Sequence, residues 1–494
     1  PVDTSYPQAE AYREVHFPEQ LEQVEVARRH FALEEFFLLQ LNVAWRKARY
    51  EAQQGRVLGR KTTLLTAFYR GLPFDLTGAQ KRSVKEIVGN MREPRPMHRM
   101  LQGDVGSGKT FVAMCAALLA IDSGAQVALM APTQILAEQH FLTFTKWLEP
   151  LGVCVGLRTS ARKENVGGEG KAQLVIGTHA LLYDEDEFDD LGLVIIDEQH
   201  KFGVEQRSRL VRQGVMPDVL VMTATPIPRT LTLAQYGELD VSKLDELPPG
   251  RQAIDTVVMG QEKLAALVDR LAAQMAEGRQ VYWVCPMVRE MDGPEDIAAA
   301  EARYAALKER FGDDVVMVHG QMPGEAKDTA MERFARGDAK LLVATTVIEV
   351  GVDVPNATLM VIEQAERFGL AQLHQLRGRV GRGLQKSFCV LLHGEALSET
   401  AQERLKLMRQ TQDGFLLAEE DLRLRGGGEL LGTRQSGDTP FSVASLDQIT
   451  ALLPKAYDDA RLLMERDGGR EGERGEAARV LLYLFERDFG VKTL

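Results

Sequence analysis

The eight residues from Gly103 to Thr110, with the sequence GDVGSGKT, form a glycine-rich pattern that can bind phosphate. Glycines allow backbone N–H groups to close around phosphate oxygens, Lys109 can reach the β- and γ-phosphates of a nucleotide, and Thr110 can hold Mg²⁺. A glycine-rich turn without any chemistry is the alternative. The pattern lies between an apolar stretch and a helical segment expected to begin at Thr110, and this context favours nucleotide binding.

A second pattern places two carboxylates at the end of an apolar run. Residues 193–196 are expected to form a buried strand, and Asp197 and Glu198 follow it directly. Ligands of open α/β sheets bind beyond the carboxyl ends of the strands. We therefore expect Asp197 to coordinate Mg²⁺ and Glu198 to orient and deprotonate an attacking water. A solvated acidic strand end is the alternative, and the phosphate loop upstream argues against it.

The segment Gln375–Arg382, with the sequence QLRGRVGR, holds three arginines within six residues. An arginine cluster is usually a solvated face or a phosphate-binding patch. Because the chain already contains a nucleotide site, the two Gly-Arg pairs predict that Arg379 and Arg382 reach the γ-phosphate across a cleft between domains. Arginines in this role contribute about 10³–10⁵ in rate. Closure of the cleft would then depend on ATP.

Short runs of Val, Ile, Leu and Ala, alternating with amphipathic segments from about Leu72, are the elements that would position these residues. Strands that are almost entirely apolar are buried on both faces, which predicts parallel sheets covered by helices and an α/β fold. The stretch Pro248–Arg251 separates two sets of runs, so we expect two α/β domains in tandem. The expected strands are Val127–Ala131, Leu174–Gly177, Leu193–Asp197, Val219–Thr223, Val281–Val284, Val315–Val318, Leu341–Ala344 and Leu359–Ile362.

The two ends of the chain have a different pattern. Apolar residues at three- to four-residue spacing predict one long helix from Val24 to Gln54, ended by Gly55. After about Ser398 the strand-like runs stop, and the remainder is expected to be helical. The expected domains are an N-terminal helical linker (1–71), a first lobe (72–250), a second lobe (251–400) and a C-terminal module (401–494).

The composition of the 494 residues, 45% hydrophobic and 26% charged, excludes disordered, collagen-like and disulfide-scaffold proteins. The longest apolar run, Phe111–Ile121, is shorter than the roughly 20 residues that cross a bilayer, and no signal peptide is visible. The four cysteines are far apart without zinc-ligand spacing, which favours a reducing compartment. A net charge of −12 argues against coating nucleic acid by charge alone, yet leaves a local basic groove open.

Together these motifs resemble superfamily 2 helicases and, among them, the RecG family of branched-DNA translocases. The resemblance runs from about Leu72 to Gly437 and implies two RecA-like lobes with ATP at their interface. It also implies an ATP- and Mg²⁺-dependent enzyme that moves on duplex DNA and remodels stalled forks and Holliday junctions. The similar stretches are GDVGSGKT, DEQH with the following KFGV (197–204), MTATPIPRTL (222–231) and ATTVIEVGVDVPNA (344–357).

The resemblance also implies roles in nucleotide binding. Phe74, Thr77 and Gln80 are similar to an adenine-reading motif, and Asp353 is similar to a ribose contact. A threonine after a strand is often only a helix cap, and Phe74 has the simpler interpretation of a core residue. The phosphate loop adds Gly103, Asp104, Val105, Gly106, Ser107 and Gly108 to this set.

A further set is implied to contact DNA or to couple hydrolysis to movement. Within it, the segment 401–437 resembles a translocation module made of a helical hairpin and the loop after it; an exposed pair of charged helices is the alternative. The residues of this set are Thr133, Thr178, His200, Thr223, Thr225, Gln375, Arg404, Arg425 and Gln435.

The resemblance also implies partners and a cellular location, and some positions of the sequence differ from the family's usual pattern. It implies duplex and branched DNA as partners, a single-stranded-DNA-binding protein as a further candidate partner, a monomeric state and the bacterial cytoplasm. Gly427 stands where a proline is usual, and the stretch 156–163 departs from the usual pattern. The chain begins at Pro1, and we expect it to be a fragment, because no counterpart of the family's N-terminal wedge domain precedes Val24.

Two other functions fit parts of the pattern. A protein-displacing duplex translocase of the transcription-repair type shares the motor, but its carboxylate box typically reads DEEQ, whereas this chain has DEQH. A nucleotide-gated binding module without turnover belongs to another class. The intact Glu198, Arg379 and Arg382 argue against it.

Overall fold

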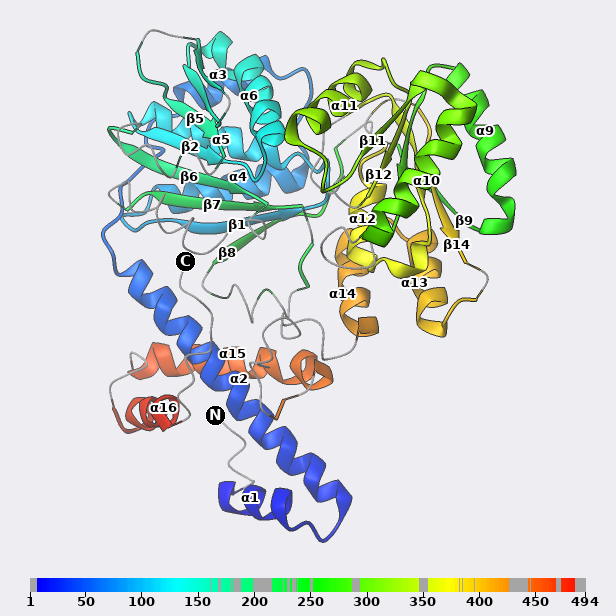
Figure 1. Ribbon diagram of the computed structural model, residues 1–494. Coiled ribbons are helices and arrows are strands. Elements are labelled where there is room, and N and C mark those ends of the chain that lie inside the picture. Colours follow the sequence, from blue (N-terminus) through cyan, green and yellow to red (C-terminus); the bar gives the residue numbers. More distant parts are fainter. Residues whose placement is uncertain are drawn as a thin grey trace.

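The computed structural model describes residues 7–160, 162–167, 170–178, 181, 188–198, 216–224, 226–228, 232, 237, 239–248, 252–286, 294–345, 354–381, 383, 385–394, 396–425, 443–444, 446–467 and 472–484. Two α/β lobes lie side by side, and helices from both ends of the chain lie below them (Figure 1). The α/β class expected from the apolar strands is confirmed.

The first lobe, within the described residues, is built on an eight-stranded sheet with the order β4-β3-β5-β2-β6-β7-β1-β8. Every neighbouring pair is parallel except β3 and β4, which form an antiparallel edge. Helix α5 is buried along almost its whole length because it packs against the centre of the sheet. The elements are α3 (Thr63–Gly71), α4 (Gly78–Met91), β1 (His98–Gly103), α5 (Lys109–Asp122), β2 (Gln126–Met130), α6 (Gln134–Leu148), β3 (Val155–Arg158), β4 (Lys163–Val166), β5 (Leu174–Gly177), β6 (Leu191–Asp197), β7 (Asp218–Thr223) and β8 (Asp240–Leu244).

The second lobe has, in the part of it that the structure describes, a six-stranded sheet with the order β11-β12-β10-β13-β14-β9. All of its strand pairs are parallel. Parallel neighbours bring the carboxyl ends of the strands to one edge, where ligands of such sheets bind. The elements are β9 (Ile254–Gly260), α9 (Leu264–Ala276), β10 (Gln280–Val284), α10 (Pro294–Phe311), β11 (Val315–Val318), α11 (Gly324–Arg336), β12 (Leu341–Ala344), β13 (Ala357–Ile362), α12 (Leu370–Arg377) and β14 (Ser387–His393).

The expected strands are all present, and the described residues form six further strands that were not expected. Strand β9 alternates polar and apolar residues, and β4 (KENV) is mostly polar because it lies at the edge of its sheet. A search for continuous apolar runs misses both patterns. The unexpected strands are β1, β3, β4, β8, β9 and β14.

The long N-terminal helix is α2 (Leu21–Glu51), so it begins and ends three residues earlier than the expected 24–54. The chain leaves the helix here because it must approach the first lobe: the Gly55 N–H donates to the Pro94 carbonyl at 3.1 Å. A Cβ at Gly55 would lie 2.3 Å from the backbone of Arg95. The glycine is therefore required by this close approach.

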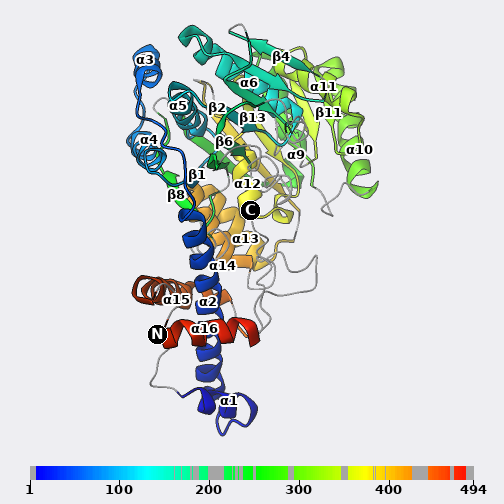
Figure 2. The same ribbon diagram turned by 90° about the vertical axis from the view of Figure 1, so that its left-hand side faces the viewer.

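C-terminal helices complete the lower part of the molecule. Helices α13 (Glu399–Gln410) and α14 (Gly414–Arg425) lie against the second lobe, whereas α15 (Leu446–Asp467) crosses α2, with α16 (Gly472–Leu484) beside them (Figures 1 and 2). The crossing buries Phe36 and Leu41 of α2 together with Leu453 and Ala456 of α15. The two ends of the chain thus share one core.

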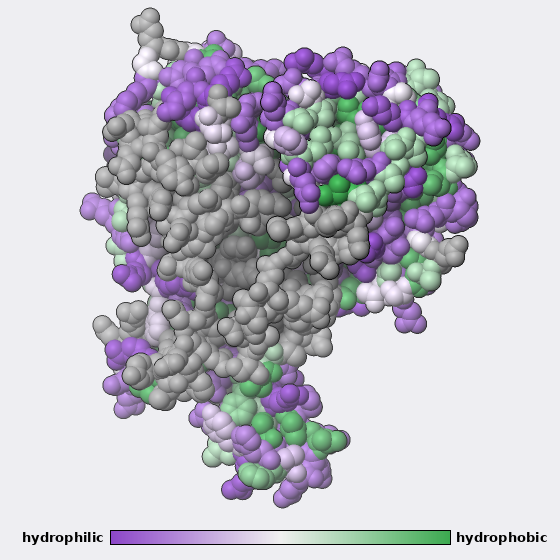
Figure 3. Space-filling view, viewed as in Figure 1, coloured by the Kyte–Doolittle hydropathy of each residue, from purple (hydrophilic) through white to green (hydrophobic). Residues whose placement is uncertain are grey.

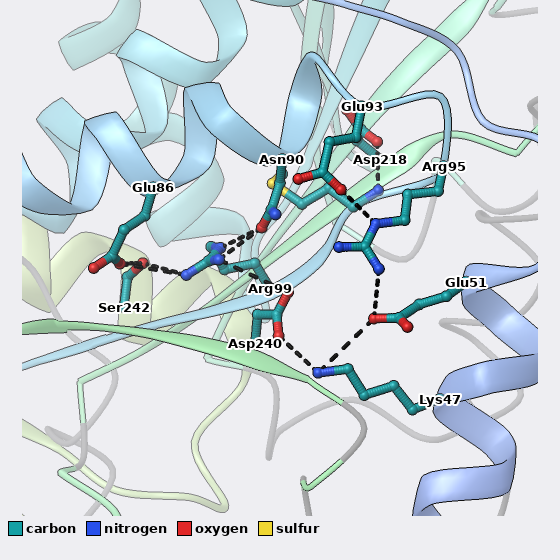
Figure 4. Close-up of polar contacts among 11 residues, drawn as sticks. Lys47, Glu51, Glu86, Asn90, Glu93, Arg95, Arg99, Asp218, Asp240 and Ser242 are labelled. Atoms are coloured by element: carbon teal, nitrogen blue, oxygen red, sulfur yellow. Dashed lines mark hydrogen bonds and ion pairs between the residues drawn. The ribbon is translucent and has the colours of Figure 1, made fainter. Parts of the chain in front are cut away.

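Helix α2 meets the first lobe through ionic contacts at the amino edge of its sheet (Figure 4). Lys47 donates to Asp240 at 2.7 Å, and Glu51 pairs with Arg95 at 2.9 Å. Arg99, largely buried, lies 3.8 Å from the second oxygen of Asp240. These charges fix the last two turns of α2 on the lobe, on the side opposite the phosphate loop.

Exposed apolar side chains lie on the first helix, α1 (Gln8–His16), on the residue after it and on the start of α2. Tyr12, Phe17, Leu21 and Val26 are 45%, 80%, 84% and 53% exposed, and apolar residues recur at the lower end of the molecule in Figure 3. None of the described helices is both long and apolar enough to cross a membrane. The four cysteines are buried and free.

Candidate nucleotide-binding site

The phosphate loop connects β1 to α5 at the carboxyl edge of the first sheet. Gly106 and Gly108 have φ values of 79° and 87°, which other residues rarely adopt. Lys109 lies across the loop and donates to the carbonyls of Gly103 (2.6 Å) and Asp104 (2.9 Å). The buried hydroxyl of Ser107 has no hydrogen-bond partner among the described residues. The loop therefore offers a cation, a hydroxyl and the amino end of α5 to a phosphate.

Gln80 supports this loop from α4. Thr77 and Gln80 form a capping box, in which the Gln80 N–H donates to Thr77 Oγ1 (3.2 Å) and the Thr77 N–H to Gln80 Oε1 (3.0 Å). The amide of Gln80 then donates to the Ser107 carbonyl at 2.9 Å. A Cβ at Gly108 would lie 2.2 Å from this amide nitrogen, so the glycine also makes room for the contact. The sequence pattern gave no sign of this support.

Phe74 is not a core residue. Its side chain is 43% exposed and packs edge-on against Phe111, with ring centroids 5.2 Å apart, and against Trp147 at 6.4 Å. A partly exposed aromatic ring near the start of α4 offers an apolar surface to a planar ligand.

Asp197 and Glu198 stand at the end of β6, as expected. Burial works to raise the pKa of Asp197, but the hydrogen bond from His140 Nε2 (2.7 Å) and the nearby charges of His140 and Lys109 outweigh it, so this pKa lies below its ordinary value. Burial and the neighbouring Asp197 raise the pKa of Glu198 to about 6. One carboxyl is thus held as an anion, while its neighbour titrates near neutrality, as a general base should.

The backbone at Glu198 has a φ of 52°, a conformation uncommon outside glycine. The side chain is directed to the Ala224 N–H, which donates to its carboxylate. Such outliers cluster at functional sites. Ala224 follows Thr223, the buried last residue of β7, so the segment expected to couple hydrolysis to movement lies beside Glu198.

Residues of the second lobe reach the same place. The positive charge of Arg379 is close enough to counteract the rise in the pKa of Glu198. A Cβ at Gly378 would lie 3.1 Å from Cβ of Val105, so the end of α12 touches the phosphate loop. The structure brings the loop, both carboxylates and one of the two expected arginines together.

The other expected residues are placed as follows. Thr133 caps α6, because its hydroxyl accepts from the Leu136 N–H at 3.4 Å, whereas Thr178 is buried beyond β5 and Gln375 is half-buried on α12. Arg404 donates to the Phe368 carbonyl at 2.8 Å and holds α13 against the turn before α12. Only the backbone of Arg425 is described, and His200, Thr225, Asp353, Arg382 and Gln435 lie outside the described residues.

Three residues that the sequence did not single out take part in the site or its surroundings. His140 contacts Asp197, and His374 contacts Asp104 across the lobes at 3.0 Å. Arg377, counted only as one of a cluster, is 2% exposed and donates to the carbonyls of Met408 and Thr411. His140 lies seven residues after Thr133, a helical spacing that could have directed attention to it. His374 and Arg377 had no such signal.

Two family models match the chain. A DEAD/DEAH box helicase model covers residues 77–233, and a model named helicase conserved C-terminal domain covers residues 262–383. The first contains the carboxylates of β6, and the second contains the arginines after α12. Each lobe therefore matches one half of a helicase motor.

Curated relatives include the ATP-dependent DNA helicase RecG of Synechocystis, 46% identical over 93% of this chain and 56% of the relative. RecG of Escherichia coli strain K12 is 47% identical over 92% of this chain and 69% of the relative. A solved structure of RecG bound to a three-way DNA junction matches with a TM-score of 0.74 and 40% identity, over 90% of this chain and 59% of that one. The chain thus spans between about half and about two thirds of the length of these proteins.

Proposed function

Because the chain belongs to the RecG family of ATP-dependent DNA helicases, we propose that it couples ATP hydrolysis to movement along duplex DNA and remodels branched DNA such as stalled forks and Holliday junctions. One observation carries the proposal: the phosphate loop and the carboxylate pair of one lobe meet Arg379 of the other. A site divided between two lobes links the chemistry to their relative movement.

In this site each residue has a separate task. The phosphate loop, from Gly103 to Thr110, binds the triphosphate, with Lys109 turning from the backbone carbonyls to phosphate oxygens. Glu198 takes a proton from the attacking water, and its raised pKa suits that role. Arg379, joined by Arg382, stabilises charge on the transferred phosphoryl group. Phe74 offers its exposed ring to the adenine, while Gln80 holds the loop from behind.

The residues present fit Mg²⁺. Asp197 is kept as an anion, and the Thr110 hydroxyl lies in the first turn of α5, so the donor set is oxygen, which this ion prefers. Mg²⁺ would neutralise charge on the phosphates. His140 contacts Oδ2 of Asp197. Oδ1 accepts the Glu198 N–H at 3.1 Å and has a second lone pair for the ion.

Movement on DNA is assigned to α13 and α14 together with residues 426–437, which lie outside the described residues. Arg404 fastens α13 to the turn before α12, and the Leu370 N–H at the start of α12 donates to Asp421 of α14 at 3.0 Å. The helix that leads to Arg379 and the hairpin are therefore packed as one unit. We assign residues 72–250 and 251–400 to the two motor lobes, 1–71 to a linker and 401–494 to the translocation hairpin and the C-terminal region. We propose a monomer because one chain supplies both halves of the site.

Steady-state ATP hydrolysis in the presence of single-stranded, duplex or forked DNA of equal length tests the proposal. We expect duplex-containing DNA to stimulate hydrolysis more than single strands do. Hydrolysis that is indifferent to every DNA would contradict it.

A further inference from the structure

A series of side-chain contacts joins the phosphate loop to the C-terminal hairpin. Asp104, the second residue of the loop, contacts His374 of α12 at 3.0 Å between Oδ1 and Nε2. The two side chains are only 17% and 10% exposed. The contact therefore crosses from the first lobe to the second in a largely dry environment.

The imidazole of His374 has one orientation and one tautomer. Arg377 Nη2 lies 3.0 Å from His374 Nδ1. A guanidinium group can only donate, so Nδ1 must accept, and the ring proton of the neutral imidazole is on Nε2. That proton points at the Asp104 carboxylate. Arg377 thus determines which way His374 donates.

Arg377 continues this chain of bonds to the hairpin. Its Nη1 donates to the Met408 carbonyl (2.7 Å) and the Thr411 carbonyl (2.9 Å), at the carboxyl end of α13. Carbonyls at the carboxyl end of a helix have no N–H partner within the helix, so these two are available to accept from Arg377. The position of α13 therefore follows that of Arg377.

The first residue of α14 also contacts the Asp104 carboxylate. The Gly414 N–H donates to Asp104, and a Cβ at Gly414 would lie 2.1 Å from Asp104 Oδ1 and 2.5 Å from His374 Nε2. Only glycine permits this approach. Burial works to raise the pKa of Asp104, yet the contacts with His374, Lys109 and Gly414 outweigh it, and this pKa lies below its ordinary value.

We propose that His374 is a positioning residue that transmits the state of the phosphate loop, through Asp104 and Arg377, to the hairpin α13–α14. Lys109 now donates to the Asp104 carbonyl, and a phosphate in the loop would compete for the same ammonium protons. Release of that carbonyl allows Asp104 to shift, and His374 carries the shift to the turn that joins α13 and α14. The inference rests on the proposed function, since it describes how that motor is coupled.

Coupling of this kind is reciprocal: if nucleotide moves the hairpin, duplex DNA on the hairpin must change nucleotide affinity by the same factor. The experiment measures the dissociation constant of adenylyl imidodiphosphate with Mg²⁺, with and without a linear duplex. We expect duplex to change this constant by about fivefold or more in the unaltered protein, the lower end of usual coupling.

In His374→Ala the ratio of the two constants should approach one. His374→Gln should restore part of the ratio, because its amide N–H can still donate to Asp104. His393→Ala is the matched control, since that imidazole bonds only to the neighbouring Gly394 carbonyl in the part of the chain that the structure describes. If His374→Ala does not fold, His374→Leu fills the space without hydrogen bonds.

A ratio of one in the unaltered protein, or an undiminished ratio in a folded His374→Ala or His374→Leu protein, would overturn the inference. Failure of the proposed function is seen separately, as an absence of DNA-stimulated hydrolysis. A protein whose hydrolysis responds to duplex, but whose nucleotide affinity does not depend on His374, keeps the proposed function and loses only this coupling route.

Discussion

Asp197 and Glu198 are neighbours in the chain, but their carboxyl groups hold protons differently. The hydrogen bond from His140 keeps Asp197 ionised against the effect of burial, whereas burial and the charge of Asp197 raise the pKa of Glu198 to about 6. Two identical functional groups thereby acquire two roles, one suited to a cation and one to a proton. The sequence predicted both residues, but not His140, which makes their pKa values differ.

Glu198→Gln should bind ATP and duplex DNA with nearly unchanged affinity and lose hydrolysis by about 10²–10⁴-fold, because the amide keeps the shape but cannot accept the proton of water. Direct titration with nucleotide and single-turnover hydrolysis measure the two effects. Lys109→Ala is the contrasting variant, since it should weaken nucleotide binding itself. Undiminished turnover in Glu198→Gln would show that Glu198 is not the general base.

The pH dependence of hydrolysis should report the same carboxyl. Glu198 acts as a base only when it is deprotonated, so kcat/KM, which reflects the free enzyme, should fall as pH decreases through about 6. A scan from about pH 5 to 8 with saturating duplex measures it. The same scan of the residual activity of Glu198→Gln shows the titration of ATP itself. If the two profiles coincide, Glu198 is not the titrating group.

At the scale of elements, the strands at the centre of each sheet were predictable because they are continuous apolar runs. Strand β1 was not, since it begins with His98 and Arg99. Glu86, Asn90 and Ser242 accept hydrogen bonds from the buried Arg99 guanidinium. The helix α12 was seen only as an arginine cluster. What it connects, Asp104 on one side and Met408 on the other, depends on tertiary contacts that no local pattern encodes.

The amino edge of the first sheet contains a buried carboxyl group whose titration affects the stability of the fold. Asp218, at the start of β7, is 2% exposed and accepts the Met97 N–H at 2.6 Å, and burial raises its pKa to about 7. The folded state therefore binds the proton more tightly than the unfolded state. Its contribution to stability is present at low pH and is lost as pH rises through about 7.

Asp218→Asn removes this titration but keeps the acceptor for Met97. The buried amide adds a cost that does not depend on pH, so the informative quantity is the change of the melting temperature with pH. We expect the melting temperature of the variant, relative to that of the unaltered protein, to increase as pH rises from about 5 to 8. Asp313→Asn, at an exposed position, serves as the control. A constant difference over this range would contradict the assignment.

In the whole molecule, two sets of contacts attach helices to the lobes. On one side, Lys47 and Glu51 fasten α2 to the amino edge of the first lobe, and α15 packs across the same helix. On the other, α12 links the nucleotide site to α13 and α14. The two lobes and the helical C-terminal region were predictable from composition and motifs, but the shared core of α2 and α15 was not, because it joins residues from opposite ends of the chain.

Hydrolysis of ATP between the lobes is proposed to drive movement along duplex DNA. Displacement of a third strand from a DNA triplex tests it most directly, because a protein that advances along the duplex removes the third strand without separating the other two. The unaltered protein should displace the strand only with ATP and Mg²⁺, and Glu198→Gln should bind the same DNA without displacing it. ATP hydrolysis that duplex stimulates but that leaves the third strand in place, in the same reaction, would contradict the claim.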